Sequence, residues 1–521
     1  MGYYCDVEQP DKYFLENHDL DGGASIYKCF DRLIALDDSL DYHEHYEKET
    51  NEDEPWSDLI TFIETLNAVP DEDFYETFMD WLDFDEWLRY YAVLNTVDDG
   101  DSYSKNYYLC HDLDEDLWMV LPWDKDLTWG LRMAFHPRVS WEHSLTQHSS
   151  VYGNILAYRM MDQPVLKNLY ASVLYEHVIE LAPLDTVYAA IDAAHAEVEA
   201  NGEVDVRKWY WEENDRLRDC DGEIRMFAEG RYGHILENVG GLVVPQELYI
   251  NEFMADNETV IADEAGEYDD WIEIYNPGPD PVDMRDYFLT DDLGDPLEWR
   301  FPDTTMVAGG YLLVWADEDL SQGPLHADLK LSRDGELIAL HKLESGFSGD
   351  PGPEDVDPVD LIFFGEQMTD VSRGRITDGD YRWGFFGTPT PGETNGNDQG
   401  ITDPGFGPAW GPVPALQAAP NPFQERVRLR LPEGYAGRRV EIYDVAGRLC
   451  RRLEAATAGA TWQWDGRLAN GQPAPPGIYW ARARVRPASS GDPQAAGTPE
   501  ATEAAKADGN LTSGTRLLLL R

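Results

Sequence analysis

The chain has 521 residues, a net charge of −60 and 42% hydrophobic residues, including 17 Trp and 28 Tyr. This length predicts two to four domains, and the apolar content is sufficient for packed cores, which excludes a wholly disordered chain. The first 420 residues carry a net charge of −65 and the last 101 carry +5, so the acidic part repels nucleic acid and anionic membranes and attracts cations and basic partners.

The cysteines and the apolar runs exclude several classes of site. No two of the five cysteines form a Cys-x-x-Cys pair, and none stands with histidines at zinc-ligand spacing, so neither a disulfide framework nor a zinc site is predicted. No stretch approaches the length of an apolar transmembrane helix. The first residues also lack the basic and apolar regions of a secretion signal. The acidic charge is equally compatible with solubility or adaptation to salty surroundings.

Residues 1–240 show mainly helical periodicity with short strands. Apolar residues at helical spacing predict helices over 56–66 and 87–94, and Asp85 is the expected N-cap of the second. Further amphipathic patterns predict helices over 156–181, 187–198 and 212–237. This part of the chain is therefore expected to be a single, largely α-helical domain.

The densest chemical signal follows the second of these helices. An acidic loop with Asp98 and Asp99 leads into a hairpin that starts at Asn106, and the second strand of the hairpin ends at Trp123. Asp124 and Asp126 follow that strand at positions i and i+2, from where both carboxylates can turn toward one Mg²⁺ ion, with the Asn106 amide as a further ligand.

A separate carboxylate on the preceding loop can accept the proton of a hydroxyl nucleophile. One acid for the base and another for the metal is the division of labour in phosphoryl transfer. The residues leave the choice between Asp98 and Asp99 open. They also leave an alternative, in which 98–101 form a simple turn and Asp124 caps a loop.

The segments 105–109 (KNYYL) and 121–130 (LPWDKDLTWG) resemble the signature of the CotH kinase family, atypical kinases of the secretory pathway with a distant fold relationship to protein kinases. The resemblance covers residues 1–240 and includes 4–29 together with Phe227 and Arg231. It implies an enzyme that uses ATP and Mg²⁺ (or Mn²⁺) to phosphorylate Ser or Thr of a surface protein. Its implied site residues are Asp98 or Asp99 as the base and Asn106, Asp124 and Asp126 on the metal.

The N-terminal lobe of that family is incomplete here. Family members begin well upstream, whereas this chain begins in the later strands of that lobe, and no GxxxxGK[ST] motif occurs. Lys28 and Asn106 are the remaining candidates for cofactor binding, although a lysine at a strand end is more often a solvated charge. We therefore expect a fragment with little or no kinase activity, whose missing part holds the rest of the lobe and a signal peptide.

The pattern changes after Gly240. Short alternating runs separated by Pro, Gly, Asn and Asp predict a β-sandwich over 245–395. The runs that carry a resemblance to the lamin-tail domain, an immunoglobulin-like sandwich, are 248–257, 270–277, 311–317, 372–375 and 390–395. The resemblance implies a module that binds or spaces, and Trp271 and Trp315 are expected in its core.

A Gly/Pro-rich linker over 396–412 precedes a third module over 413–521. Its motifs are 421–423 (NPF), 440–448 (VEIYDVAGR), 464–466 (WDG) and 476–479 (PGIY). They resemble either the FlgD-like domain or the type IX secretion sorting domain, and this choice stays open. A low-complexity insertion over 487–514 is expected to be disordered, with a final strand over 515–521.

The predicted fold class is multidomain α+β: an atypical protein-kinase-like C-lobe, mainly helical, followed by two immunoglobulin-like β-sandwiches. The first hypothesis is an exported kinase with an extracellular or surface protein as substrate, located outside the cell or on its surface, and with export machinery as a partner of the last domain. The second is a non-catalytic surface adhesion or scaffold protein. The third is divalent-cation binding by the acidic face without catalysis.

Overall fold

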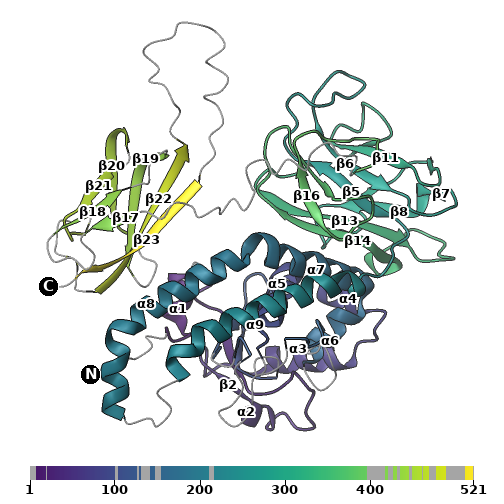
Figure 1. The fold of residues 1–521 in the computed structure, drawn as a ribbon. Coiled ribbons are helices and arrows are strands. Elements are labelled where there is room, and N and C mark those ends of the chain that lie inside the picture. Colours follow the sequence, from purple (N-terminus) through teal and green to yellow (C-terminus); the bar gives the residue numbers. More distant parts are fainter. Residues whose placement is uncertain are drawn as a thin grey trace, which may run out of the picture. The chain divides into compact units, whose positions relative to one another are not determined.

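The chain divides into two compact units. The computed structural model describes residues 8–18, 20–99, 104–125, 128–130, 141–146, 154–209, 216–395, 417–419, 426–430, 435–444, 449–459, 461–468, 474, 477–487 and 511–519. The first unit comprises Met1–Lys12 and Asp21–Gly405, and the second comprises Tyr13–Leu20 and Phe406–Arg521. The elements are drawn in Figure 1.

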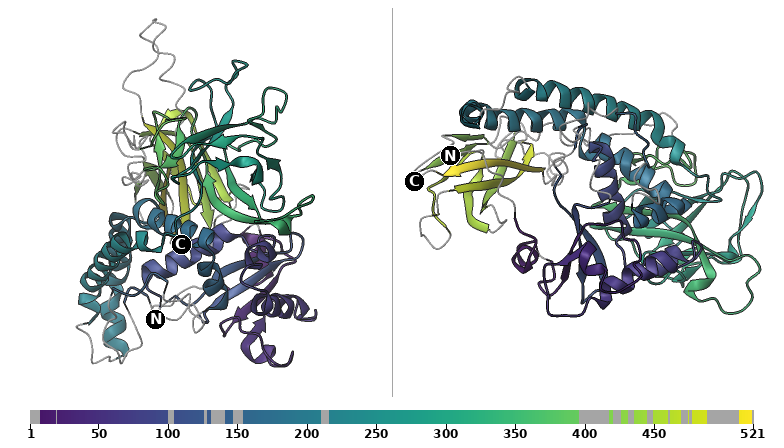
Figure 2. Two further views of the ribbon diagram at one scale, coloured as in Figure 1. Left: turned by 90° about the vertical axis from the view of Figure 1, so that its right-hand side faces the viewer. Right: turned by 90° about the horizontal axis from the view of Figure 1, so that it is seen from below.

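The N-terminal domain of the first unit contains a four-stranded antiparallel sheet. Its order is β2 (Tyr46–Lys48), β1 (Ser25–Cys29), β3 (Tyr107–Asp112) and β4 (Leu117–Pro122). The helices of this domain are α2 (Tyr42–His45), α3 (Ser57–Ala68), α4 (Phe74–Phe78), α5 (Phe84–Val97), α6 (Ile155–Asp162), α7 (Pro164–Glu176), α8 (Leu184–Trp209) and α9 (Arg216–Asn238). Helix α1 (Lys12–Asn17) belongs to the second unit from Tyr13 onward. A π-helical turn over His177–Leu181 follows α7, and a 3₁₀ turn over Val239–Leu242 follows α9. Figure 2 shows α8 and α9 running side by side.

Two features of these helices differ from the sequence-based expectations. Asp85 is not the N-cap of α5, because Asp83 has the extended backbone of a cap and its carboxylate accepts the Glu86 N–H at 3.0 Å. Asp85 lies in the first turn and pairs with Arg89 at 2.7 Å instead. The single helix expected over 156–181 is interrupted at Pro164, which has no N–H to donate and is the first residue of α7.

The first sandwich consists of two layers of strands. The larger sheet has the order β12 (His326–Ala327), β11 (Tyr311–Ala316), β6 (Asp270–Tyr275), β5 (Tyr249–Met254), β15 (Ser372–Arg375) and β16 (Trp383–Phe386). The smaller has the order β14 (Val356–Gly365), β13 (Gly335–Leu343), β8 (Tyr287–Thr290) and β9 (Trp299–Arg300), and β7 (Val282–Asp283) pairs with β10 (Thr305–Met306). Trp271 and Trp315 are buried, as predicted.

The smaller sheet is apolar on both faces. Ile338, Leu340, Ile362 and Phe364 point into the sandwich, whereas the alternate residues Leu337, Ala339, Leu361 and Phe363 pack on the core of the N-terminal domain. Polar bonds reinforce this contact: Glu176 of α7 lies 3.2 Å from both Arg89 and Arg373. Because one face of the sandwich is buried in this way, the two predicted modules form a single compact unit.

The buried His341 of β13 makes this contact sensitive to acid. Its side chain is 1% exposed, its ring lies 6.0 Å from that of Tyr75, and neither ring nitrogen has a hydrogen-bond partner among the described residues. Burial lowers the pKa of His341 from 6.5 to about 4. The native state therefore binds fewer protons than the unfolded chain between these two pH values, and its stability falls as the pH is lowered through that window.

We expect His341→Leu to remove this dependence. A pKa change of this size corresponds to about 3 kcal/mol, so the stability of the variant relative to the wild type should rise by about 2–3 kcal/mol between pH 7 and pH 4.5. Urea unfolding of the full chain at both pH values measures this difference, and the wild-type profile serves as the control. Parallel pH profiles of the two proteins would contradict the prediction.

The second unit is a smaller sandwich. One sheet has the order β17 (Gln417–Ala419), β18 (Val427–Arg430) and β21 (Thr461–Trp464), and the other has the order β20 (Leu449–Gly459), β19 (Tyr435–Asp444), β22 (Gly477–Pro487) and β23 (Leu511–Leu519). Strand β23 pairs with β22 from Leu511 onward, so it begins four residues earlier than predicted. The predicted linker and most of the predicted insertion lie outside the described residues.

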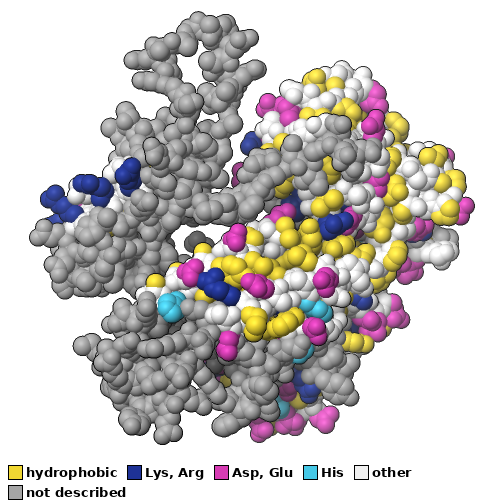
Figure 3. Space-filling view, in the orientation of Figure 1, with side chains coloured by type: hydrophobic (Ala, Val, Ile, Leu, Met, Phe, Trp, Pro, Cys, Tyr) yellow, Lys and Arg dark blue, Asp and Glu magenta, His cyan; other side chains and the backbone are white. Residues whose placement is uncertain are grey.

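The charge separation in the sequence is visible on the surface. In the face drawn in Figure 3, Asp and Glu side chains are spread over the described part of the first unit. The charged side chains described on the second unit in this view are Lys and Arg, and the exposed residues of β18 are Arg428 and Arg430. In the described part of the chain, no helix has the length and apolar character needed to cross a membrane.

Candidate active site

Helix α5 ends where the two predicted catalytic carboxylates begin. Asp98 is the C-cap and has a left-handed backbone (φ +49°, ψ +53°), and the Asp99 N–H closes the helix on the Leu94 carbonyl at 2.9 Å. Glycine is the usual residue in this conformation because it has no Cβ. Asp98 and Asp99 are only 2% and 1% exposed. The helix end therefore delivers two buried carboxylates at one point of the fold.

The two carboxylates have different partners. Both Asp98 oxygens lie within hydrogen-bond distance of His143 Nδ1, at 3.0 and 3.1 Å. Asp99 Oδ2 lies 3.8 Å from Lys125 Nζ. A buried carboxylate needs such partners, because burial without them carries a large desolvation cost. The sequence pattern did not distinguish Asp98 from Asp99 as the candidate base, whereas in the structure the two carboxylates have different partners.

The hairpin brings Asn106 and Asp124 to the same end of the sheet. Asn106 immediately precedes β3, and its carbonyl accepts a hydrogen bond at 3.3 Å from the N–H of Trp123, which immediately follows β4. The same carbonyl accepts a hydrogen bond from Lys125 Nζ at 2.9 Å. Lys125 also donates to the Tyr90 hydroxyl of α5 at 3.3 Å. This lysine thus joins α5, the hairpin and Asp99.

Three predicted site residues share an unusual backbone conformation. The φ angles of Asp98, Asn106 and Asp124 are +49°, +62° and +53°. Asp and Asn tolerate positive φ better than most residues, but each such residue still stores strain, and strained residues cluster at functional sites. Asp and Asn also take this conformation in ordinary turns and helix C-caps, so the choice between a functional site and an Asp-rich turn stays open.

Lys28 reaches the same region from β1. Its ammonium lies 5.7 Å from the centroid of the Trp123 ring and 5.4 Å from that of Phe30. The structure therefore brings this predicted cofactor residue beside the Trp-Asp segment. Asp126, the second predicted metal ligand after β4, lies outside the described residues.

The donors present suit a hard cation. Asp124 offers an exposed carboxylate and Asn106 an amide oxygen, and Mg²⁺ prefers a few such oxygen ligands together with water and phosphate. Among the described residues, the groups of three His, Cys, Asp or Glu side chains close enough to share an ion occur in the first sandwich and do not include Asp124. The metal role of Asn106, Asp124 and Asp126 stays a prediction.

Helix α9 contributes a buried arginine that contacts the end of α5 and the segment 141–143. Arg231 is fully buried and donates to the carbonyls of Asn95 (2.9 Å), Trp141 (3.0 Å) and His143 (2.7 Å). A Cβ added at Gly230 would lie 2.4 Å from the Trp141 ring, so this approach of α9 requires glycine. Arg231 thereby ties the end of α5 to the segment that carries His143.

Sequence reasoning missed His143 and the role of Lys125. His143 lies 45 residues after Asp98, with no motif that connects them. Lys125 was visible inside the Trp-Asp-Lys-Asp segment, where its position between two acids was the available signal.

Comparison with known families follows the three predicted modules. Residues 1–235 match the CotH kinase protein family, residues 244–347 match the Lamin Tail Domain, and residues 423–488 match the FlgD Ig-like domain. The last match favours the first of the two alternatives for the C-terminal module. The CotH match includes Lys28, both candidate bases, Asn106 and the Trp-Asp segment.

Individual relatives are more distant. This chain is 26% identical over 205 residues to the inner spore coat protein H of Bacillus subtilis (strain 168). The aligned region covers 38% of this chain and 55% of that protein. The chain thus spans about half the length of this curated relative. Two solved structures from Porphyromonas gingivalis are also similar.

One is dimeric latent PorU, with 14% identity and a TM-score of 0.15 over 51% of this chain and 19% of that chain. The other is PorZ, a surface component of the type IX secretion system, with 15% identity and a TM-score of 0.13 over 43% of this chain and 21% of that chain.

Proposed function

We propose that this chain belongs to an exported atypical kinase that transfers the γ-phosphoryl group of ATP to Ser or Thr of a surface protein. The observation that carries the proposal is the contact of Lys125 with both Asp99 and the Asn106 carbonyl, directly beside Asp124. This arrangement combines a buried acid, a fixed cation and an exposed acid at one end of a sheet, which phosphoryl transfer needs. The CotH match over residues 1–235 supports it.

Within this proposal Asp99 is the base and Asp98 a positioning residue. A base must be ionised and within hydrogen-bond reach of the substrate hydroxyl. Asp99 lies 3.8 Å from the ammonium of Lys125, which also contacts the hairpin next to Asp124, whereas Asp98 is held by His143 on the side of the 141–146 segment. Asp98 would then fix the loop on which Asp99 lies.

Asp124, Asn106 and Asp126 would hold Mg²⁺ or Mn²⁺, and Lys28 would contact a phosphate of the nucleotide. When bound, the ion would neutralise charge on the phosphoryl oxygens. The exposed position of Asp124 allows an ion to keep water ligands, which Mg²⁺ prefers. Trp123, half-buried beneath Lys28, limits where that ammonium can lie.

The test uses the complete open reading frame that contains this chain, purified and incubated with labelled ATP and Mg²⁺. We expect Asp99→Asn to lower the rate of phosphoryl transfer by about 10²–10⁴-fold at an unchanged KM for ATP. Asp124→Ala should lower the rate and raise the Mg²⁺ concentration needed for half-maximal activity. Asp98→Asn should retain more activity than Asp99→Asn.

Asp114→Ala is the matched control, because this acid is exposed in the turn of the same hairpin. It should leave the rate unchanged. No transfer by the wild type, or equal transfer by the wild type and Asp124→Ala, would remove the kinase proposal. The remaining candidates would then be a non-catalytic surface adhesion or scaffold protein and divalent-cation binding without catalysis.

The proposed location is outside the cell or on its surface. It rests on the occurrence of the three matched domain families in one chain. It also rests on the B. subtilis relative, whose name places that protein in the spore coat. Export machinery that recognises the C-terminal module is the corresponding proposed partner.

A further inference from the structure

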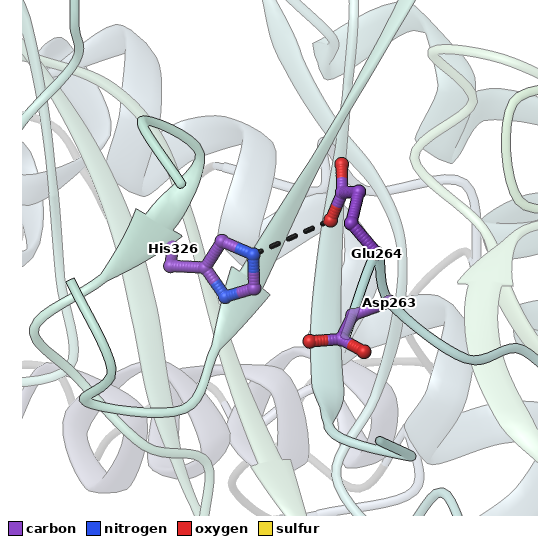
Figure 4. A group of neighbouring side chains, drawn as sticks. All are labelled: Asp263, Glu264 and His326. Carbon is purple, nitrogen blue, oxygen red and sulfur yellow. Dashed lines mark hydrogen bonds and ion pairs between the residues drawn. The ribbon is translucent and has the colours of Figure 1, made fainter. Parts of the chain in front are cut away.

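Acidic side chains of the loop between β5 and β6 meet a histidine of the edge strand β12. Asp263, Glu264 and His326 each offer a ligand atom, and these atoms all lie within 4.8 Å of one another. Figure 4 shows the three side chains converging, with His326 Nε2 3.4 Å from a Glu264 oxygen. A second group of Asp263, Glu267 and Asp269 meets the same criterion and shares Asp263.

Two carboxylate oxygens among these side chains, one of Asp263 and one of Asp269, have no hydrogen-bond partner among the described residues. Asp263 is 9% exposed, and its Oδ1 accepts the Glu267 N–H at 2.7 Å. Its Oδ2, like Oδ2 of Asp269, is buried and has no hydrogen-bond partner among the described residues. Orphaned buried oxygens in native proteins call for an explanation, and a bound ion is one that would satisfy both carboxylates.

His326 is oriented as a metal ligand would be. The ring is 2% exposed, and Nδ1 lies 2.5 Å from Oδ2 of the buried Asp317. In the neutral ring this contact places the proton on Nδ1, so that the lone pair of Nε2 points at the carboxylates. Metal-bound histidines are usually held in this way by a second carboxylate.

We propose that Asp263, Glu264 and His326 bind one divalent transition-metal ion, of the Zn²⁺ or Mn²⁺ kind, with Asp269 and Glu267 beside it. An imidazole among carboxylates selects such ions over Ca²⁺ and Mg²⁺, which prefer oxygen ligands alone. The ion links the loop of residues 255–269 to β12, the edge strand of the larger sheet. It therefore pins this loop to a sheet edge and compensates the unpaired charge of Asp263.

Without an ion, a protonated His326 between Asp317 and Glu264 would be a simple ion-pair cluster. The two cases differ in whether the full chain binds metal. The test is calorimetric titration of the chelator-treated chain with Zn²⁺, without nucleotide, together with its melting temperature with and without Zn²⁺. We expect saturable binding at one ion per chain and a higher Tm with the ion.

Asp263→Asn and His326→Gln should each weaken Zn²⁺ binding at least tenfold and abolish the rise in Tm. Glu264→Gln keeps the test valid if those variants fold poorly, because Glu264 is 79% exposed and its replacement leaves the core untouched. It should also weaken binding. Asp303→Asn, an 86% exposed acid of the same sandwich, is the matched control and should bind as the wild type does.

Asp124→Ala should retain this Zn²⁺ site, which separates it from the proposed kinase centre. No stoichiometric Zn²⁺ binding by the wild type, or equal affinity in all three site variants, would overturn the proposal and leave His326 as the charge partner of Asp317 and Glu264.

Discussion

Replacing Arg231 with alanine is expected to destabilise the first unit by about 3–5 kcal/mol, because each hydrogen bond to a charged group contributes about 1.5–3 kcal/mol. Arg231 is 0% exposed and donates to the carbonyls of Asn95, Trp141 and His143. Alanine would leave these oxygens buried without their donor and would leave a cavity between α9 and α5. The segment that carries His143, the partner of Asp98, would lose its anchor.

The measurement is urea unfolding of the full chain, followed by Trp fluorescence. Arg225→Ala is the matched control on the same helix: Arg225 pairs with Asp192, whose side chain is 74% exposed, so its loss should cost about 1 kcal/mol or less. Arg231→Lys should fall between the two, since an ammonium cannot reproduce the fork of donors. Equal losses for Arg231→Ala and Arg225→Ala would contradict the prediction.

Local patterns predicted the parts of the candidate site that lie close together in the sequence. Asn106, Trp123 and Asp124 belong to one hairpin, and the helix that ends at Asp98 has clear apolar periodicity. His143 could not be found in this way, because it approaches Asp98 only through the packing of α9. The separate surroundings of Asp98 and Asp99 likewise follow from tertiary contacts, which neighbouring letters do not encode.

The metal-ligand group of the first sandwich was missed for a similar reason. Asp263 and His326 lie on a loop and on an edge strand more than sixty positions apart in the sequence, and the sheet order brings them together. Metal-ligand spacing is diagnostic in a sequence mainly for cysteine and histidine pairs, and no such pattern occurs here. Carboxylates are so frequent in this chain that their spacing carries little information.

The packing of the first sandwich on the N-terminal domain has a signal in the sequence. The strands of one-sided sheets alternate between apolar and polar residues, whereas β13 and β14 contain the continuous apolar runs 337–340 and 361–364. Such runs indicate a sheet covered on both faces, and here the second cover is the N-terminal domain. The strand positions were predictable from alternation and turns, but the neighbour that covers them was not.

The second large effect concerns the two layers of the first sandwich, which a buried ion pair holds together. Asp360 of β14 and Arg375 of β15 lie 2.7 Å apart with side chains 4% and 6% exposed. Asp360 also accepts the Ile250 N–H of β5 at 2.8 Å, so it contacts both sheets. Burial raises the pKa of Asp360 against the opposing effect of Arg375.

We expect Arg375→Met to lower the free energy of unfolding by about 3–5 kcal/mol, because it leaves an unpaired buried carboxylate. The loss of stability relative to the wild type should grow as the pH rises from 4 to 8. A carboxyl group whose pKa is raised in the folded state is more stable in its protonated form there, so the folded state is disfavoured at a pH at which the unfolded chain ionises this group. Asp283→Ala, which breaks the exposed pair with Arg285, is the control and should leave the unfolding midpoint unchanged.

A double-mutant cycle decides whether the pair or the packing of Arg375 carries the effect. Arg375 also lies over the rings of Tyr249 and Trp383, at 4.9 and 4.6 Å from their centroids, so Arg375→Met removes these contacts as well. If the unpaired charge dominates, Asp360→Leu together with Arg375→Met should be more stable than Arg375→Met alone, since a well-packed apolar pair often replaces a buried ion pair without loss. Additive losses in urea unfolding of the two single variants and the double variant would instead assign the effect to packing on the aromatic rings.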